Sequence, residues 1–313
     1  MASQSMKKNL FRFFKLLIVA IILYFMLRQI LTQWDLVRNY QWRINWLLLI
    51  LSLVALQFGL FVKSWLWSQV LRCFGQTLPA LRAFRVAYLS NLGRYIPGKV
   101  MQFVGIMYLA KKEGIREDAA VSSFALVQLF DTPSGLILIF LYYLILGSSM
   151  AQIRQYLPVL FILGALTLVS FLIILVPSLM DRMLNLILKV FKQPRLEFEL
   201  KKKTGIWLLI LYFIDWNIIG AAFYLFLRAI TDVPVDFFLQ ACLVYVAAYL
   251  IGYWALFAPG GIGVREGAMS VFLMQIGGLL KPVAYAVSLA ARLWFMVGEI
   301  LVSILALMVR KKD

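Results

Sequence analysis

The chain contains the stretch WLLLILSLVALQFGLFVKSWLWSQVL at residues 46–71, which is apolar apart from one lysine and a few neutral polar side chains. An α-helix of about 20 residues crosses the roughly 30 Å hydrocarbon core of a bilayer. This stretch exceeds that length and therefore predicts a membrane-spanning helix. Comparable apolar stretches occur at about 13–31, 119–146, 157–176, 204–227 and 283–309.

The composition supports the same interpretation for the whole chain. Hydrophobic residues make up 63% of the 313 residues and charged residues only 14%, against about 25% charged residues in a soluble domain. Lipid tolerates only backbones that satisfy their own hydrogen bonds, and the alternating pattern of a barrel strand is absent from the sequence. We therefore predict an all-α integral membrane protein, a single domain over residues 1–313 that forms a polytopic helical bundle of about 6–8 spans.

The placement of positive charge predicts the orientation. The net charge is +17, with four Lys or Arg residues at 7–15, eight at 72–118, seven at 177–203 and three at 310–312. Only five occur in the alternate connections, so the positive-inside rule places both termini in the cytoplasm. The basic connections can also bind anionic lipid. Because no RNA- or DNA-binding motif accompanies these charges, nucleic acid is not an expected partner.

A first irregular region, residues 79–110, is basic at both ends and is therefore expected to enter the membrane and return as a hairpin. The polar and helix-breaking residues near its centre include Asn91, Arg94, Pro97, Gly98, Lys99 and Gln102. A polar turn at membrane depth is tolerated only if it is buried in protein or lines a wet cavity. Two cations beside a helix break suit a phosphodiester headgroup. The alternative is a cytoplasmic loop whose charges only set the topology.

A second irregular region, residues 234–281, is interrupted by Pro259, Gly260, Gly261, Gly263, Arg265 and Glu266. Proline ends a helix, and glycines permit left-handed backbone and close approach by a ligand. A helix starting near residue 264 would present free N–H groups and its positive dipole end to an anion such as phosphate. Arg265 could add a bidentate contact, and Glu266 could pair with Arg265 or take up a proton. The alternative is an interfacial turn with a solvated ion pair.

Both irregular regions fit an inverted repeat with halves 1–148 and 149–313. Each half then has the order span, span, broken hairpin, span, and the two halves start on opposite sides of the membrane. Paired Gly/Pro-broken segments in corresponding places point to a substrate site. The region 234–281 can be a hairpin from the outer face or two full spans, and the charges do not decide between these two forms.

Charged side chains inside spans cost about 2.5–3.5 kcal/mol each on insertion scales, so they usually face a partner or a cavity. Asp131 and Arg292 fit a functional role and a structural pairing equally well, whereas we interpret Asp215 as structural. Arg292 and Glu299 are seven residues apart, so they share one helix face.

Two other cations, Lys63 and Arg28, are expected to extend toward the nearer end of their spans and to be structural. The chain has no histidine, and Cys73 and Cys242 form no framework. There is also no P-loop or serine nucleophile motif. We therefore assign no catalytic residue, no metal and no cofactor.

The segments Pro259-Gly260-Gly261-Ile262-Gly263-Val264-Arg265-Glu266-Gly267 and Asn91-x-x-Arg94-x-Ile96-Pro97-Gly98-Lys99 resemble the lysylphosphatidylglycerol synthase transmembrane family. This is the flippase-like domain of bacterial multiple peptide resistance factors. The resemblance covers nearly the whole chain. The family often carries an acid–Arg pair followed by Asp near 120–140; Asp131 fits, but Val127-Gln128 stands where the pair would be.

In bifunctional members, a soluble domain synthesises lysyl-phosphatidylglycerol and the membrane domain moves it across the bilayer. The present chain ends at Asp313, directly after its last span, so we expect a free-standing member that does not synthesise the lipid. Such relatives occur in bacteria and archaea, which implies a prokaryotic cytoplasmic membrane. Others are linked to polyprenyl-phosphate sugars or hopanoids, so the resemblance implies lipid translocation as a class and leaves the lipid open.

The leading hypothesis is therefore a translocase for a phosphate-bearing or aminoacylated lipid. Arg94, Lys99 and Arg265 would bind phosphate. Asp131, Glu266 and Glu299 would contact an amino group or couple to protons. The alternatives are a membrane-embedded transferase acting on a lipid-linked substrate, or a non-catalytic partner of a separate lipid synthase. The sequence does not indicate the oligomeric state.

Overall fold

The structure is a computed structural model that describes residues 34–40, 42, 44–91, 100–147, 157–190, 200–255 and 258–309, with the isolated positions 24, 28 and 31. The helices are α2 (Trp34–Arg38), α3 (Trp46–Arg72), α4 (Ala80–Asn91), α5 (Val100–Lys112), α6 (Glu117–Gly147), α7 (Leu157–Leu175), α8 (Pro177–Val190), α9 (Lys202–Ile230), η3 (Val235–Phe237), α10 (Phe238–Trp254), η4 (Pro259–Gly261), α11 (Val264–Gln275) and α12 (Lys281–Met308). No strand occurs in these residues. The prediction of an all-α polytopic membrane protein is confirmed.

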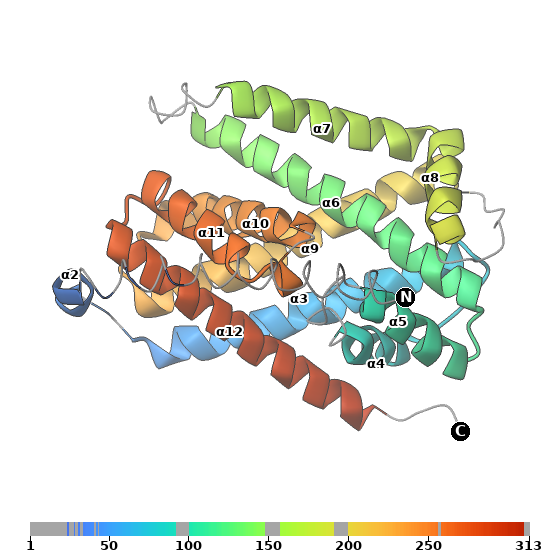
Figure 1. The fold of residues 1–313 in the computed structure, drawn as a ribbon, viewed down its shortest axis with the longest axis horizontal. Helices are drawn as coiled ribbons and strands as arrows, with labels where there is room; N and C mark the ends of the chain where they lie inside the picture. Colours follow the sequence, from blue (N-terminus) through green and yellow to red (C-terminus); the bar gives the residue numbers. More distant parts are fainter. Residues whose placement is uncertain are drawn as a thin grey trace, which may run out of the picture.

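Five described helices are long and apolar enough to cross a membrane: Trp46–Arg72, Glu117–Leu146, Lys202–Ile230, Val235–Trp254 and Lys281–Met308. A sixth candidate is the pair α7 and α8, which is bent by 93°. Figure 1 shows α7 along α6 at the edge of the bundle, with α8 turning away at its end. The predicted first span, 13–31, falls outside the described residues apart from positions 24, 28 and 31.

Glycines allow the central helices to approach each other closely. A Cβ on Gly59 of α3 would lie 2.8 Å from Ile219 of α9, and one on Gly298 of α12 would lie 2.4 Å from Leu56 of α3. A Cβ on Gly220 of α9 would lie 2.5 Å from the sulfur of Cys242 in α10. Lipid is as apolar as the helices themselves, so small residues at the contacts, rather than an amphipathic pattern, favour close packing. Helix α9 is thereby surrounded by α3, α6 and α10.

The first irregular region contains two short helices, α4 and α5, of 12 and 13 residues. Each is about 18–20 Å long, which is too short to cross a hydrocarbon core of about 30 Å. The two helices pack against each other at Gly105 of α5 and Ser90 of α4. A Cβ added to Gly105 would lie 3.1 Å from the Cβ of Ser90. The connection between them, with Arg94, Pro97, Gly98 and Lys99, lies outside the described residues.

The second irregular region contains one span-length segment and one short helix. Val235–Trp254 is long enough to cross the membrane, whereas the 12 residues of α11 extend only about 18 Å. The chain doubles back between them, because a Cβ on Gly252 would lie 2.7 Å from that of Arg265. Of the two forms left open by the sequence, this arrangement excludes two full spans.

The contacts between helices are reciprocal in the two halves. Helix α3 packs on α9, α4 packs on α12, and α10 packs on α6. The pairs α4/α5 and α10/α11 lie toward opposite ends of the long helices in Figure 1. Exchanging α3–α6 with α9–α12 preserves these contacts, which supports the inverted repeat.

Candidate functional site

A cavity of about 140 Å³ lies among the long helices, with walls from α3–α6 and from α9–α12. A cavity of about 150 Å³ in another protein holds a benzene-sized molecule. The present cavity therefore has room for a small headgroup but not for a whole lipid. The charged and amide side chains that line it are Lys63, Asn91, Gln102, Gln128, Asp131, Arg265 and Glu299.

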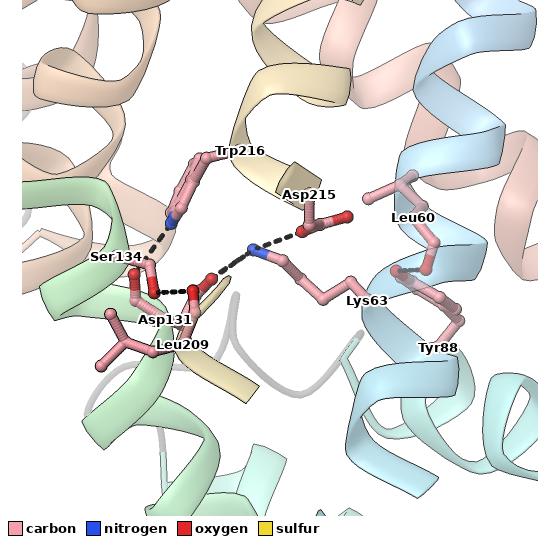
Figure 2. A network of polar contacts seen from close by, with 8 residues as sticks. All are labelled: Leu60, Lys63, Tyr88, Asp131, Ser134, Leu209, Asp215 and Trp216. Carbon is pink, nitrogen blue, oxygen red and sulfur yellow. Dashed lines mark hydrogen bonds and ion pairs between the residues drawn. The ribbon is translucent and has the colours of Figure 1, made fainter. Parts of the chain in front are cut away.

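Lys63 of α3 lies between two carboxylates at one side of the cavity (Figure 2). Its Nζ donates to both oxygens of Asp131 in α6, at 2.9 and 3.2 Å. It also lies 3.7 Å from Oδ2 of Asp215 in α9 and 4.3 Å from the ring centre of Trp216. The Trp216 indole N–H donates to the backbone oxygen of Asp131 at 2.8 Å, which connects α9 to α6 at this point. The cation of α3 is therefore held by side chains from two other helices, α6 and α9.

The expectation that Lys63 extends to the end of its span is wrong. Lys63 is nine residues from Arg72, the last residue of α3, and nine residues correspond to about 14 Å of helix. That distance is longer than a lysine side chain. The number of residues between Lys63 and the end of its span can be read from the sequence. It could have identified Lys63 as a residue that requires an internal partner. Asp215, interpreted as structural, is one of the two carboxylates that flank it.

Arg265, in the first turn of α11, projects onto aromatic rings rather than onto an acid. The carbon at the centre of its guanidinium is 4.9 Å from the Tyr245 ring, 4.8 Å from Tyr249 and 4.5 Å from Phe295. Arg265 is only 5% exposed. Within the described part of the chain, no carboxylate lies within 4 Å of it. Cation–π contacts hold the guanidinium and leave its N–H donors available to an anion in the cavity.

The neighbouring residue, Glu266, stabilises the glycine turn instead of pairing with Arg265. Its Oε2 accepts a hydrogen bond from the N–H of Gly263 at 2.5 Å, as a glutamate at the third position of a helix commonly does. Its Oε1 lies 3.5 Å from Nε of Arg292 in α12. Arg292 also donates to the backbone oxygen of Gly260 at 3.2 Å. The pair Glu266–Arg292 thus fixes the turn against α12.

The glycines of this turn are required by backbone geometry. Gly260, Gly261 and Gly263 have φ of 61°, 71° and 83°, in the left-handed region that glycine enters most readily. A Cβ on Gly261 would also lie 2.7 Å from the carbonyl oxygen of Gly252. Together these restraints direct the first turn of α11, and with it Arg265, toward the cavity.

The opposite wall carries a chain of amides that ends at an acid. Gln102 of α5 donates to the side-chain oxygen of Asn91 in α4 at 2.9 Å. Asn91 in turn donates to Oε1 of Glu299 in α12 at 3.3 Å. Glu299 lines the cavity and is 7% exposed. This chain joins the first broken segment to the last span of the second half.

The predicted site residues therefore fall into three groups. The cavity brings together Asn91, Gln102, Asp131, Gly260, Arg265 and Glu299. The turn behind it is formed or fixed by Pro259, Gly261, Gly263, Glu266 and Arg292. Arg94, Pro97, Gly98 and Lys99 lie outside the described residues. The lining residues that the sequence did not suggest include Lys63, Trp216, Tyr245 and Tyr249. The tyrosines lay within an apolar run that offered no signal for them.

Comparison with curated proteins finds no match to the chain. By contrast, the family model for the lysylphosphatidylglycerol synthase TM region matches residues 12–303, nearly its entire length. That family links a multi-pass membrane protein to lipid metabolism. The chain belongs to the lysylphosphatidylglycerol synthase transmembrane region family.

Proposed function

We propose that this protein is a lipid translocase that holds a phosphate-bearing headgroup in the cavity while the acyl chains stay in the bilayer. The observation that carries the proposal is Arg265, a buried cation with no carboxylate within 4 Å in the described chain. A buried charge is costly unless it is paired. A phosphate oxygen pair would satisfy the guanidinium in bidentate geometry.

The position of the cavity between the two halves supports movement of the lipid rather than static binding. Residues of α3–α6 form one wall, and residues of α9–α12 form the other. In transporters built from inverted repeats, rocking of one repeat against the other exposes a central site alternately to each side. The reciprocal helix contacts fit this scheme.

Acidic side chains in the same cavity favour a headgroup that also carries a positive group. Glu299 and Asp131 both line the cavity that Arg265 lines. A zwitterionic or aminoacylated headgroup would then meet a group of opposite charge at each end. Its amino group would bind at either carboxylate, and its phosphate would bind at Arg265. The charge distribution favours an orientation with both termini in the cytoplasm, and membership of the family favours a prokaryotic cytoplasmic membrane.

The proposal can be tested with purified protein in liposomes that contain acyl-chain-labelled phosphatidylglycerol, phosphatidylethanolamine or lysyl-phosphatidylglycerol. The fraction of label accessible to an external quencher is followed over time. The wild type should equilibrate at least one of these lipids faster than empty liposomes, and Arg265→Ala should not. Arg116→Ala removes an exposed arginine that does not line the cavity and should behave as the wild type. Equal rates for wild type and empty liposomes with all three lipids would refute the proposal.

A further inference from the structure

The group formed by Asp131, Lys63 and Asp215 contains one cation and two carboxylates (Figure 2). Among the described residues, no other cation lies within 4 Å of either carboxylate. If both acids were ionised, the group would carry one unbalanced negative charge inside a bundle of membrane-spanning helices. Such a charge is costly away from water.

The two carboxylates have different surroundings. Asp131 lines the cavity, has 11% of its side chain exposed and accepts hydrogen bonds from Lys63. Asp215 has no exposure. Neither of its oxygens accepts a hydrogen bond within the described chain, and its only ion pair there is the 3.7 Å contact with Lys63. One acid is therefore open to a ligand and the other is sealed behind it.

The nearest side chains that pack around this group are neutral aromatics, and the cation of α11 that lines the same cavity is Arg265. Tyr212 contributes a fully buried phenol from α9, one turn before Asp215, and Tyr249 contributes a ring from α10, 5.8 Å from Lys63. Tyr88 of α4 donates its hydroxyl to the backbone oxygen of Leu60. Helix α7 carries no ionisable side chain. The charged residues of α12 nearest the cavity are Glu299, hydrogen-bonded to Asn91, and Arg292, paired with Glu266. Arg265 lies against aromatic rings and is not within 4 Å of either carboxylate, so none of these groups supplies a second positive charge in contact with the two acids.

We infer that Asp131, Lys63 and Asp215 together bind one proton, and that its release is coupled to occupation of the cavity. Interacting acids of this kind share protons as a group. The proton resides on Asp215 while Lys63 pairs with Asp131. When a cationic part of a headgroup reaches Asp131, the Lys63 ammonium moves to Asp215, the O–H bond of Asp215 breaks, and the proton leaves through the cavity. The reverse sequence takes up one proton. This coupling rests on the proposed translocase function, whereas proton binding itself does not.

Proton binding can be measured without any lipid transport. The infrared spectrum of purified protein in deuterated and ordinary water should show the carbonyl stretch of a buried protonated carboxylic acid. Asp215→Asn and Asp131→Asn each leave one cation with one carboxylate, so both variants should lose this band. Glu113→Gln is the matched control, because Glu113 is a buried acid already balanced by Arg82 and Arg85; it should keep the band. Absence of the band from the wild type between mildly acidic and neutral pH would overturn the inference, even if a variant fails to fold.

Coupling is tested in the liposomes described above, with a trapped pH-sensitive dye and an imposed difference of about one pH unit. The wild type should accumulate labelled lipid in one leaflet and move protons only when that lipid is present. Asp215→Asn should show no accumulation of lipid in one leaflet and no proton flux, whatever rate of lipid equilibration it retains. Lipid movement by the wild type that is unaffected by the gradient and unaccompanied by proton flux would overturn the coupling while leaving the translocase function intact.

Discussion

Lys63 and Arg265 are both cations that line the same cavity, but their partners differ completely. Lys63 is held by two carboxylates from α6 and α9. Arg265 is held by three aromatic rings from α10 and α12, and within the described chain it has no acidic partner. The comparison suggests how to separate charges that stabilise the bundle from charges that serve a ligand. Removing a cation such as Lys63 leaves acids unpaired, whereas removing Arg265 leaves no acid unpaired among the described residues.

The largest expected effect is the loss of stability in Lys63→Met. Removing one partner of a buried ion pair typically costs about 3–5 kcal/mol because the remaining charge is uncompensated. Here Asp131 and Asp215 would both be left without their cation. The free energy of unfolding, measured by denaturant titration in detergent micelles, should fall by about 3 kcal/mol.

The matched substitution Arg265→Met should lower that free energy by less than about 1 kcal/mol, because it leaves no acid unpaired in the described chain. The two substitutions each remove one positive charge at the cavity and introduce the same side chain. Equal destabilisation by both would contradict the distinction between the two cations.

The second effect concerns anion recognition by Arg265. Losing a bidentate charge-assisted contact weakens binding by about 3 kcal/mol. Arg265→Ala should therefore slow lipid equilibration about 100-fold. Arg265→Lys keeps the charge but lacks the planar fork and should fall between the wild type and alanine. A lysine variant as slow as alanine would show that shape, rather than charge, dominates recognition.

A third prediction tests the turn that positions Arg265. Gly261→Ala forces a Cβ to 2.7 Å from a backbone oxygen at φ of 71°, so it should destabilise the protein by about 2 kcal/mol. Gly267→Ala, in the helix α11 that follows the turn, is the control, because a Cβ there meets nothing within 4 Å. It should be neutral or stabilising by up to about 1 kcal/mol. Thermal unfolding of the two variants in one detergent gives the comparison; an equal loss in both would contradict it.

The smallest effect is expected for Asn91→Ala. It removes the 3.3 Å hydrogen bond to Glu299 and the acceptor for Gln102. A hydrogen bond to a charged group contributes about 1.5–3 kcal/mol at most, and the long distance here favours a smaller value. Lipid equilibration should slow about threefold, with the free energy of unfolding changed by less than about 1 kcal/mol. A loss as large as that of Arg265→Ala would place Asn91 in direct contact with the lipid.

Much of the turn around Pro259 could be predicted from the sequence, because its constraints are local. After Pro259, three glycines adopt positive φ, and α11 starts within a few residues at Val264. The partner of Glu266 could not be predicted in the same way. Arg265 is adjacent in sequence, yet Arg292 on another helix is the residue that pairs with Glu266. Neighbouring residues of a helix project about 100° apart, so adjacency did not place the two charges together.

The sequence alone determined that this chain is an all-α membrane protein with two Gly/Pro-broken segments, because hydropathy, span length and backbone hydrogen bonding are properties of contiguous residues. Only the tertiary structure decided which side chains meet. Lys63 joins acids that are 68 and 152 positions further along the chain. The reason is that α3 and α9 are apolar on nearly all sides, so lipid-facing and protein-facing surfaces look alike in sequence. Close packing at glycines such as Gly59 and Gly220 sets the rotation of these helices, and that rotation directs the charges into one cavity.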